Sequence, residues 1–256
     1  MSGHSKWSQI KRSKGKIDSQ RGAAFTKVSR EIYVAAKLGG ADPAGNFRLK
    51  TCIEKAKQAS MPLENIKKAI QRATSGSNTE NFEELQYEGY GAGGVAVIVS
   101  SMTDNRNRTA GEIRSYFTKC DGNMGETGCV GWMFSEKGIM TVSDHKGDLI
   151  NFDDLFMSAA ELGADDVVEI DNGIYQVITE PNNNVLESVQ KGLDKLGYTT
   201  SDVEISMLPN NSVEINDELT AKKVLKLLDL LENNDDVQNV YSNFDIKEDI
   251  LSLVSN

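Results

Sequence analysis

The basic and acidic residues of this 256-residue chain are divided unevenly along its length. Residues 1–72 contain 16 Lys and Arg against 5 Asp and Glu, a net charge of +11, whereas residues 73–256 carry a net charge of −21. Like charges packed together repel one another unless a partner neutralises them. The division therefore predicts a polyanion-binding segment attached to an acidic body. The alternative, a helical face that is merely solvated, would normally carry charges of mixed sign.

The basic segment divides into an arm and a helical part. Residues 2–20 contain few large apolar side chains, so they cannot bury enough surface to fold alone and are predicted to be an arm. Apolar residues at helical spacing then predict three helices, over residues 24–39, 43–59 and 62–75. Helices of this length predict a small three-helix bundle. The polar residues 75–80 predict the linker that follows it.

From residue 82 onward the pattern becomes mixed α+β. Strands are expected at 82–90 and 94–101, followed by a helix at 105–119 that Thr103 or Asp104 caps. The next elements follow the order β-α-β-β-α-β, which is the ferredoxin-like arrangement. They are predicted at 132–142, 152–162, 167–170, 174–179, 185–196 and 203–207.

The last predicted elements, a helix at 217–231 and a strand at 237–243, have no local sheet to join. We expect them to return to the ββα unit that precedes Cys120, so that the ferredoxin-like module is inserted into a discontinuous domain. The fold class is thus α+β with three domains. The predicted boundaries are 1–78 for the arm and bundle, 79–130 plus 208–256 for the middle domain, and 131–207 for the inserted domain.

A glycine-rich motif lies between the first two predicted strands. Residues 89–94, GYGAGG, match the dinucleotide-binding pattern G-x-G-x-x-G. In a dinucleotide site the motif opens a helix, whose amino terminus holds the pyrophosphate. Here it leads into the β-branched run 95–99, so a hairpin turn is favoured over nucleotide binding.

The residues used in metal binding and catalysis are sparse. Cys52, Cys120 and Cys129 form no C-x-x-C pair, and their odd number predicts reduced, mostly buried thiols. Of the two histidines, His4 lies in the arm and His145 in a polar stretch expected to be solvated. We therefore expect a protein that is not an enzyme and binds no cofactor or metal. Without an apolar signal or membrane segment, we expect a soluble, cytoplasmic chain.

The candidate nucleic-acid contacts are mainly basic side chains in the arm, on the predicted helices and at the start of the 105–119 helix. They are His4, Lys6, Trp7, Lys11, Arg12, Lys14, Lys16, Arg21, Lys27, Arg30, Arg48, Arg106 and Arg108. Further basic residues continue along the bundle helices as Lys37, Lys50, Lys55, Lys57, Lys67, Lys68 and Arg72.

Two of these candidates have competing explanations. Trp7 can stack on a base or pack onto the bundle and anchor the arm. Arg106 and Arg108 stand at a helix amino terminus, where a positive charge opposes the helix macrodipole. Phosphate contact and a salt bridge to an acidic neighbour explain the two arginines equally well.

Several motifs, in the same order along nearly the whole chain, closely resemble the YebC/PmpR family. That family includes the mitochondrial translational activator of cytochrome c oxidase. The motifs are GHSKW at 3–7, GGADP at 39–43 with Asn46 and Arg48, Met61-Pro62, YEGYG at 87–91, TDNRNRT at 103–109, and GCV at 128–130 running into WMF at 132–134. Ala92 stands where many members have proline, a change confined to a turn. The resemblance implies a helical bundle and two α+β domains, the last inserted into the middle one.

The resemblance also implies a regulator of gene expression without a known catalytic residue. The expected function is a DNA-binding transcriptional regulatory protein, or alternatively a ribosome-associated translation factor that relieves stalling at proline-rich stretches. The expected partner is thus DNA, ribosomal RNA or both. A body of charge −21 would be repelled by a long duplex, whereas the ribosome offers RNA to the arm and basic proteins to the body. A third interpretation is a scaffold whose acidic domains bind a protein partner.

Overall fold

The chain forms two compact units in the computed structural model, which describes residues 17–75, 82–247, 250, 253 and 254. One unit is Ser135–Leu208, and the other contains the described residues on either side of it in the sequence. The chain therefore leaves the larger unit after Phe134 and re-enters it at Pro209. The α+β class is confirmed. The three-domain boundaries at residues 78, 130 and 207 remain our proposal.

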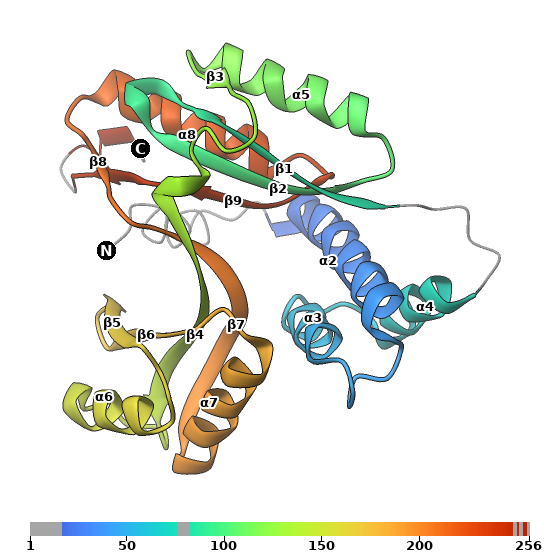
Figure 1. The fold of residues 1–256 in the computed structure, drawn as a ribbon, viewed down its shortest axis with the longest axis vertical. Helices are drawn as coiled ribbons and strands as arrows, with labels where there is room; N and C mark the ends of the chain where they lie inside the picture. The colour runs from blue at the N-terminus through green and yellow to red at the C-terminus, as the bar shows by residue number, and fades with distance from the viewer. Residues whose placement is uncertain (1–16, 76–81, 248–249, 251–252, 255–256) are drawn as a thin grey trace. The chain divides into compact units, whose positions relative to one another are not determined.

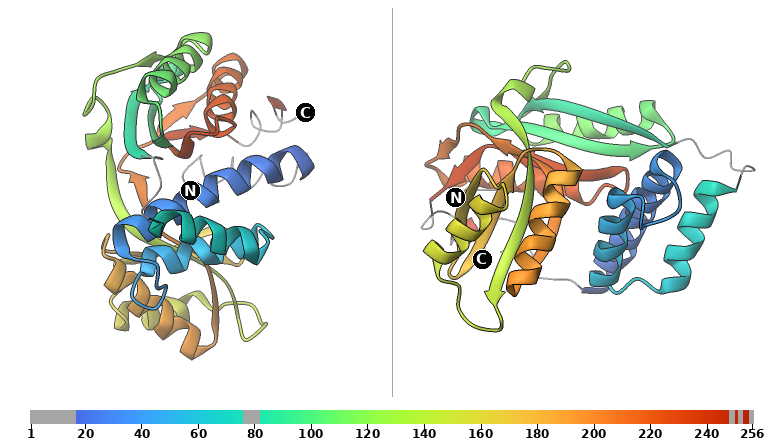
Figure 2. Two further views of the ribbon diagram at one scale, coloured as in Figure 1. Left: turned by 90° about the vertical axis from the view of Figure 1, so that its right-hand side faces the viewer. Right: turned by 60° about the horizontal axis from the view of Figure 1, so that its bottom comes forward.

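The bundle consists of α2 (Ile17–Gly39), α3 (Phe47–Gln58) and α4 (Leu63–Thr74), which pack together in Figure 2. Their buried side chains include Ile32, Leu49, Cys52, Ala56 and Ile66. These residues recur at helical spacing, which is why the sequence predicted the bundle.

The second helix begins later than predicted because of Asn46. The Asn46 side chain accepts the Leu49 N–H at 3.0 Å, which caps α3 at residue 46. Its amide also donates to the carbonyls of Ala35 at 2.8 Å and Gly40 at 2.9 Å. One buried side chain thus ties the end of α2 to the start of α3. A Cβ on Gly39 would lie 2.6 Å from the Asn46 amide nitrogen, so this approach requires glycine.

The larger unit contains an antiparallel sheet in the order β3-β1-β2-β9. Its strands are β1 (Glu83–Tyr90), β2 (Ala96–Thr103), β3 (Asn123–Met124) and β9 (Val237–Ser242). The glycine motif forms the turn between β1 and β2, where Gly93 and Gly94 have φ values of 71° and 77°. The predicted hairpin is therefore confirmed, because the motif opens a strand rather than a nucleotide-binding helix.

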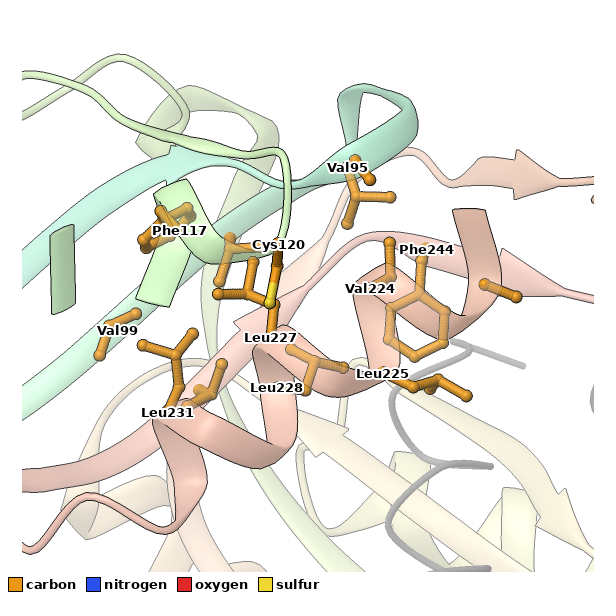
Figure 3. Close-up of a cluster of buried hydrophobic side chains, with 14 of the residues drawn as sticks. Val95, Val99, Phe117, Cys120, Val224, Leu225, Leu227, Leu228, Leu231 and Phe244 are labelled. Atoms are coloured by element: carbon orange, nitrogen blue, oxygen red, sulfur yellow. The ribbon is translucent and has the colours of Figure 1, made fainter. Parts of the chain in front are cut away.

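Two helices pack on one face of this sheet: α5 (Arg106–Lys119) and α8 (Glu218–Glu232) (Figure 1). Figure 3 shows the apolar core they form, with Phe117, Leu228 and Phe244 among its fully buried side chains. Since β9 pairs with β2, the segment after residue 209 returns to the first sheet as predicted. A parallel pair, β8 (Val213–Ile215) and β10 (Phe244–Ile246), completes this unit.

The inserted unit has the β-α-β-β-α-β order and a sheet arranged β5-β6-β4-β7. Its elements are β4 (Phe134–His145), α6 (Phe152–Glu161), β5 (Asp166–Asp171), β6 (Ile174–Thr179), α7 (Asn183–Leu196) and β7 (Tyr198–Pro209). This is the predicted ferredoxin-like arrangement. However, β7 begins five residues before the predicted start at 203. Polar residues such as Thr199, whose hydroxyl donates to Asp144 at 2.9 Å, hide this edge strand from the sequence pattern.

A buried carboxylate holds the loop that leads toward the inserted unit. The Glu88 side chain accepts backbone N–H bonds from Gly128 at 3.0 Å, Val130 at 2.9 Å and Gly131 at 2.7 Å. Burial opposes the ionisation of Glu88, but the three N–H groups outweigh burial and hold its pKa below the ordinary value of 4.5. The charged form of Glu88 therefore stabilises the link between β1 and this loop.

Replacing Glu88 tests that link. Glu88→Gln turns an amide toward backbone donors, and we expect the free energy of unfolding at neutral pH to fall by about 1–3 kcal/mol. Because the folded pKa of Glu88 is depressed, its contribution is present above 4.5 and is lost as the pH falls through the folded pKa. Urea unfolding over this range should show the two proteins converging in acid. Glu84→Gln, an exposed change on the same strand, should alter stability by under about 1 kcal/mol.

Candidate nucleic-acid interface

Two predicted contact residues on α2 bind other parts of the larger unit. The Lys27 ammonium donates to the Glu232 carbonyl at 2.6 Å, at the end of α8, where unpaired carbonyls carry partial negative charge. The Arg30 guanidinium donates to the Asp236 carboxylate at 2.8 Å and lies 5.4 Å from the centre of the Phe82 ring. The Arg30 side chain is only 17% exposed. These contacts give Lys27 and Arg30 an internal role that joins the bundle to the α8–β9 connection.

Asp236 is the acceptor that gathers these contacts. Besides Arg30, its buried carboxylate accepts from Arg108 at 2.7 Å, from the Thr109 hydroxyl at 2.7 Å and from the Thr103 hydroxyl at 3.1 Å. Burial opposes ionisation, but the bonds from Arg108 and Thr109 and the charge of Arg30 outweigh it, so the pKa of Asp236 lies below its ordinary value. Asp236 is therefore a charged acceptor at the junction of the bundle, α5 and β9.

The start of α5 separates the roles of its two arginines. The cap is Asn105, whose side chain accepts the Arg108 N–H at 3.1 Å. The predicted caps are wrong because Thr103 ends β2 and the Asp104 carboxylate pairs with the Arg108 side chain at 3.0 Å. Of the two explanations considered for these arginines, the salt bridge therefore applies to Arg108. Arg106 is exposed and forms no ion pair with any carboxylate in the part of the chain that the structure describes.

The structure describes only some of the remaining candidate residues. Arg48 forms a half-exposed ion pair with Glu84. The backbone of Arg21 lies in α2, while its side chain is outside the description. The candidates outside the described residues are His4, Lys6, Trp7, Lys11, Arg12, Lys14 and Lys16.

Other basic residues of the bundle are more accessible than Lys27 and Arg30. Lys57 in α3 and Lys68 in α4 are exposed, and neither forms an ion pair among the residues described. Lys67 and Arg72 are also exposed on α4. The sequence showed these charges, but it carried no signal that separates them from Lys27 and Arg30. That difference arises from packing.

The side chains of Cys52 and His145 pack against other parts of the protein. Burial raises the pKa of the Cys52 thiol to about 12, so this group stays protonated at neutral pH. The His145 ring stacks on Tyr198 with centres 4.4 Å apart, and one ring nitrogen lies 3.2 Å from the Leu196 carbonyl. The prediction that His145 lies in a solvated loop is wrong, since β4 extends through this residue.

None of the helices described is long and apolar enough to span a membrane.

Comparison with known proteins assigns the chain to a family. The model of the TACO1/YebC second and third domain matches residues 82–244, and that of the TACO1/YebC N-terminal domain matches residues 5–76. The chain belongs to the TACO1/YebC family. The resemblance seen in the sequence motifs is therefore confirmed.

Relatives in which about half of the residues are identical match nearly the whole chain. A Geobacter sulfurreducens protein is 51% identical over 96% of both chains, and a Persephonella marina protein is 50% identical over 100% of both. Both are named "Probable transcriptional regulatory protein". A crystal structure of a conserved hypothetical protein from Aquifex aeolicus has 47% identity and a TM-score of 0.82, covering 92% of this chain and 95% of that one.

Removing the charge of Asp236 should loosen the junction. Asp236→Asn leaves the poorly exposed Arg30 without its carboxylate, and we expect the free energy of unfolding to fall by about 3–5 kcal/mol. Asp104→Asn is the matched control, because Asp104 pairs with Arg108 in a more exposed setting. Its effect should stay below about 1 kcal/mol. Urea denaturation measures both, and equal effects would contradict the central role of Asp236.

Proposed function

We propose that this TACO1/YebC-family protein is a nucleic-acid-binding regulator of gene expression, and that residues 1–72 make the main contact. The observation that carries the proposal is the exposure of Lys57 and Lys68, without ion-pair partners among the described residues, in a segment of net charge +11. A polyanion would neutralise these charges and release its own counterions. The names of the relatives support a regulatory role.

The proposed interface follows accessibility. It comprises the basic arm, Lys57 and Lys68 on the bundle, and Arg106 at the start of α5. Arg30 and Arg108 support this surface instead, since their guanidinium groups hold the Asp236 carboxylate. Positive side chains that are hydrated in the free protein contribute to phosphate binding without first breaking an internal ion pair.

Duplex DNA is the first candidate target, because the relatives are named as transcriptional regulatory proteins. A second candidate, ribosomal RNA within the ribosome, is favoured by the charge of the inserted unit. Residues 135–208 contain 15 Asp and Glu against 4 Lys, and this net charge of −11 opposes close approach to a long duplex. On a ribosome, basic proteins lie beside the RNA and would accommodate such a unit. The second candidate role is therefore that of a translation factor relieving stalling at proline-rich stretches.

Replacing the accessible lysines tests the bundle surface. The double variant Lys57→Ala, Lys68→Ala should weaken binding to labelled DNA and RNA and reduce the slope of log K against log salt by about two. Lys191→Ala, Lys222→Ala is the matched control, because these exposed lysines on α7 and α8 pair with glutamates. Fluorescence anisotropy at several salt concentrations measures both variants. An unchanged slope in the first variant would remove the bundle from the interface.

Replacing the arm lysines and arginine separates the two targets. A variant with Ala at Lys6, Lys11, Arg12, Lys14 and Lys16 is compared with the wild type in ribosome co-sedimentation at physiological salt and in retention of promoter DNA against excess random DNA. Co-sedimentation that the variant loses supports the translation role. Selective retention of promoter DNA that the variant loses supports the transcription role. If the variant binds both nucleic acids as the wild type does, with the same salt dependence, the arm is not the contact.

A further inference from the structure

Large apolar side chains gather on the exposed face of α6 in the inserted unit. Phe152 and Phe156, four residues apart on one helical face, are 41% and 39% exposed. Met157, next in the sequence and about 100° further around the helix, is 60% exposed. Leu149, just before the helix, is 90% exposed. We call these four residues the α6 face. Exposed apolar groups that lie together on a helix mark an interaction site more often than scattered ones do.

The fully buried residues of α6 are not part of the α6 face. Leu155 and Ala159 are the α6 residues that are fully buried against the sheet. The two phenylalanine rings instead contact each other, with centres 6.0 Å apart, and Phe152 lies 5.8 Å from the ring of buried Tyr175. This arrangement holds aromatic rings at the surface in a defined position. Side chains that are already ordered lose little conformational entropy when a partner covers them.

The stretch of sequence that contains the α6 face is acidic. Residues 147–190 contain ten Asp and Glu and no Lys, Arg or His. Asp148 lies next to Leu149, Asp153 and Asp154 form the first turn of α6, and all three are exposed. The hairpin turn at Gly173 approaches Leu149, and exposed Asp171 precedes that turn. An apolar centre with a negative rim repels nucleic acids and anionic lipids and attracts a cationic polypeptide.

We propose that the α6 face is the docking site for a basic amphipathic helix of a partner protein. The apolar side chains of that helix cover Phe152, Phe156 and Met157, while its Lys and Arg residues flank them and face Asp153 and Asp154. This site goes beyond the proposed function, because it uses the acidic inserted unit instead of the basic segment. It gives that unit a protein-binding role that does not require nucleic acid.

A defined peptide tests the proposal on the full chain. The probe is a labelled helical peptide with Leu on one face and Lys on the other, and its control carries Glu in place of Lys. We expect the Lys peptide to bind at least about tenfold more tightly than the Glu peptide, with an affinity that falls as salt rises. Equal binding of the two peptides, or binding of neither, would overturn the proposal.

Two exposed apolar residues of the same unit provide the matched variants. Phe156→Ser should weaken Lys-peptide binding about tenfold. Leu196→Ser, at a side chain that is 46% exposed at the end of α7, should leave it unchanged. Met157→Ser keeps the comparison valid if Phe156→Ser lowers stability. Equal loss in Phe156→Ser and Leu196→Ser would show nonspecific attraction to the acidic unit and overturn the site.

Two further measurements identify the occupant and separate this proposal from the first one. Phe156→Ser should retain wild-type affinity for DNA and RNA. The peptide-docking proposal and the nucleic-acid proposal can therefore fail independently of each other. Deleting residues 1–16 should leave Lys-peptide affinity unchanged. A gain in affinity on that deletion would identify the chain's own basic segment as the occupant, which would overturn the assignment to a partner protein.

Discussion

The larger unit depends on the ionised carboxylate of Asp236. Arg30 from the bundle and Arg108 from α5 both donate to it, although they lie 206 and 128 residues away in the sequence. The hydroxyl groups of Thr103 and Thr109 supply the remaining hydrogen bonds, so the buried charge is compensated from several elements. Because a buried charge is tolerated only with such partners, this one group couples the position of α2 to the start of α5 and the entry into β9.

Because of that junction, the nucleic-acid interface that we propose contains fewer basic residues than the sequence alone suggests. Lys27 and Arg30 are directed to the end of α8 and to Asp236, whereas Lys57 and Lys68 face solvent without ion-pair partners among the residues described. The inserted unit carries the opposite charge: acidic residues flank the apolar α6 face in the sequence. We therefore propose a different partner for each region: a nucleic acid for the basic segment, and a cationic protein helix for α6.

Local patterns predicted most of the architecture, and the errors have specific causes. Periodic apolar residues located the bundle helices, and the β-branched run after the glycine motif predicted a hairpin, which is confirmed. The predicted caps of α5 were wrong because Thr103, Asp104 and Asn105 are all suitable capping types, and only the strand end selects Asn105. The start of β7 was missed because residues 199–202 are polar and because β7 is an edge strand, with β4 as its neighbour in the sheet.

The sequence by itself determined the order of the longer elements, the insertion of one unit into another and the separation of positive from negative charge. These properties follow from local periodicity and composition, which need no knowledge of distant contacts. Only the tertiary structure decided which charges are available to a partner. Arg106 and Arg108 are two residues apart with the same chemistry, and both are exposed. Arg108 nevertheless holds Asp236, whereas Arg106 forms no ion pair among the described residues. An ion pair between residues so far apart in the chain forms only when folding brings their elements together.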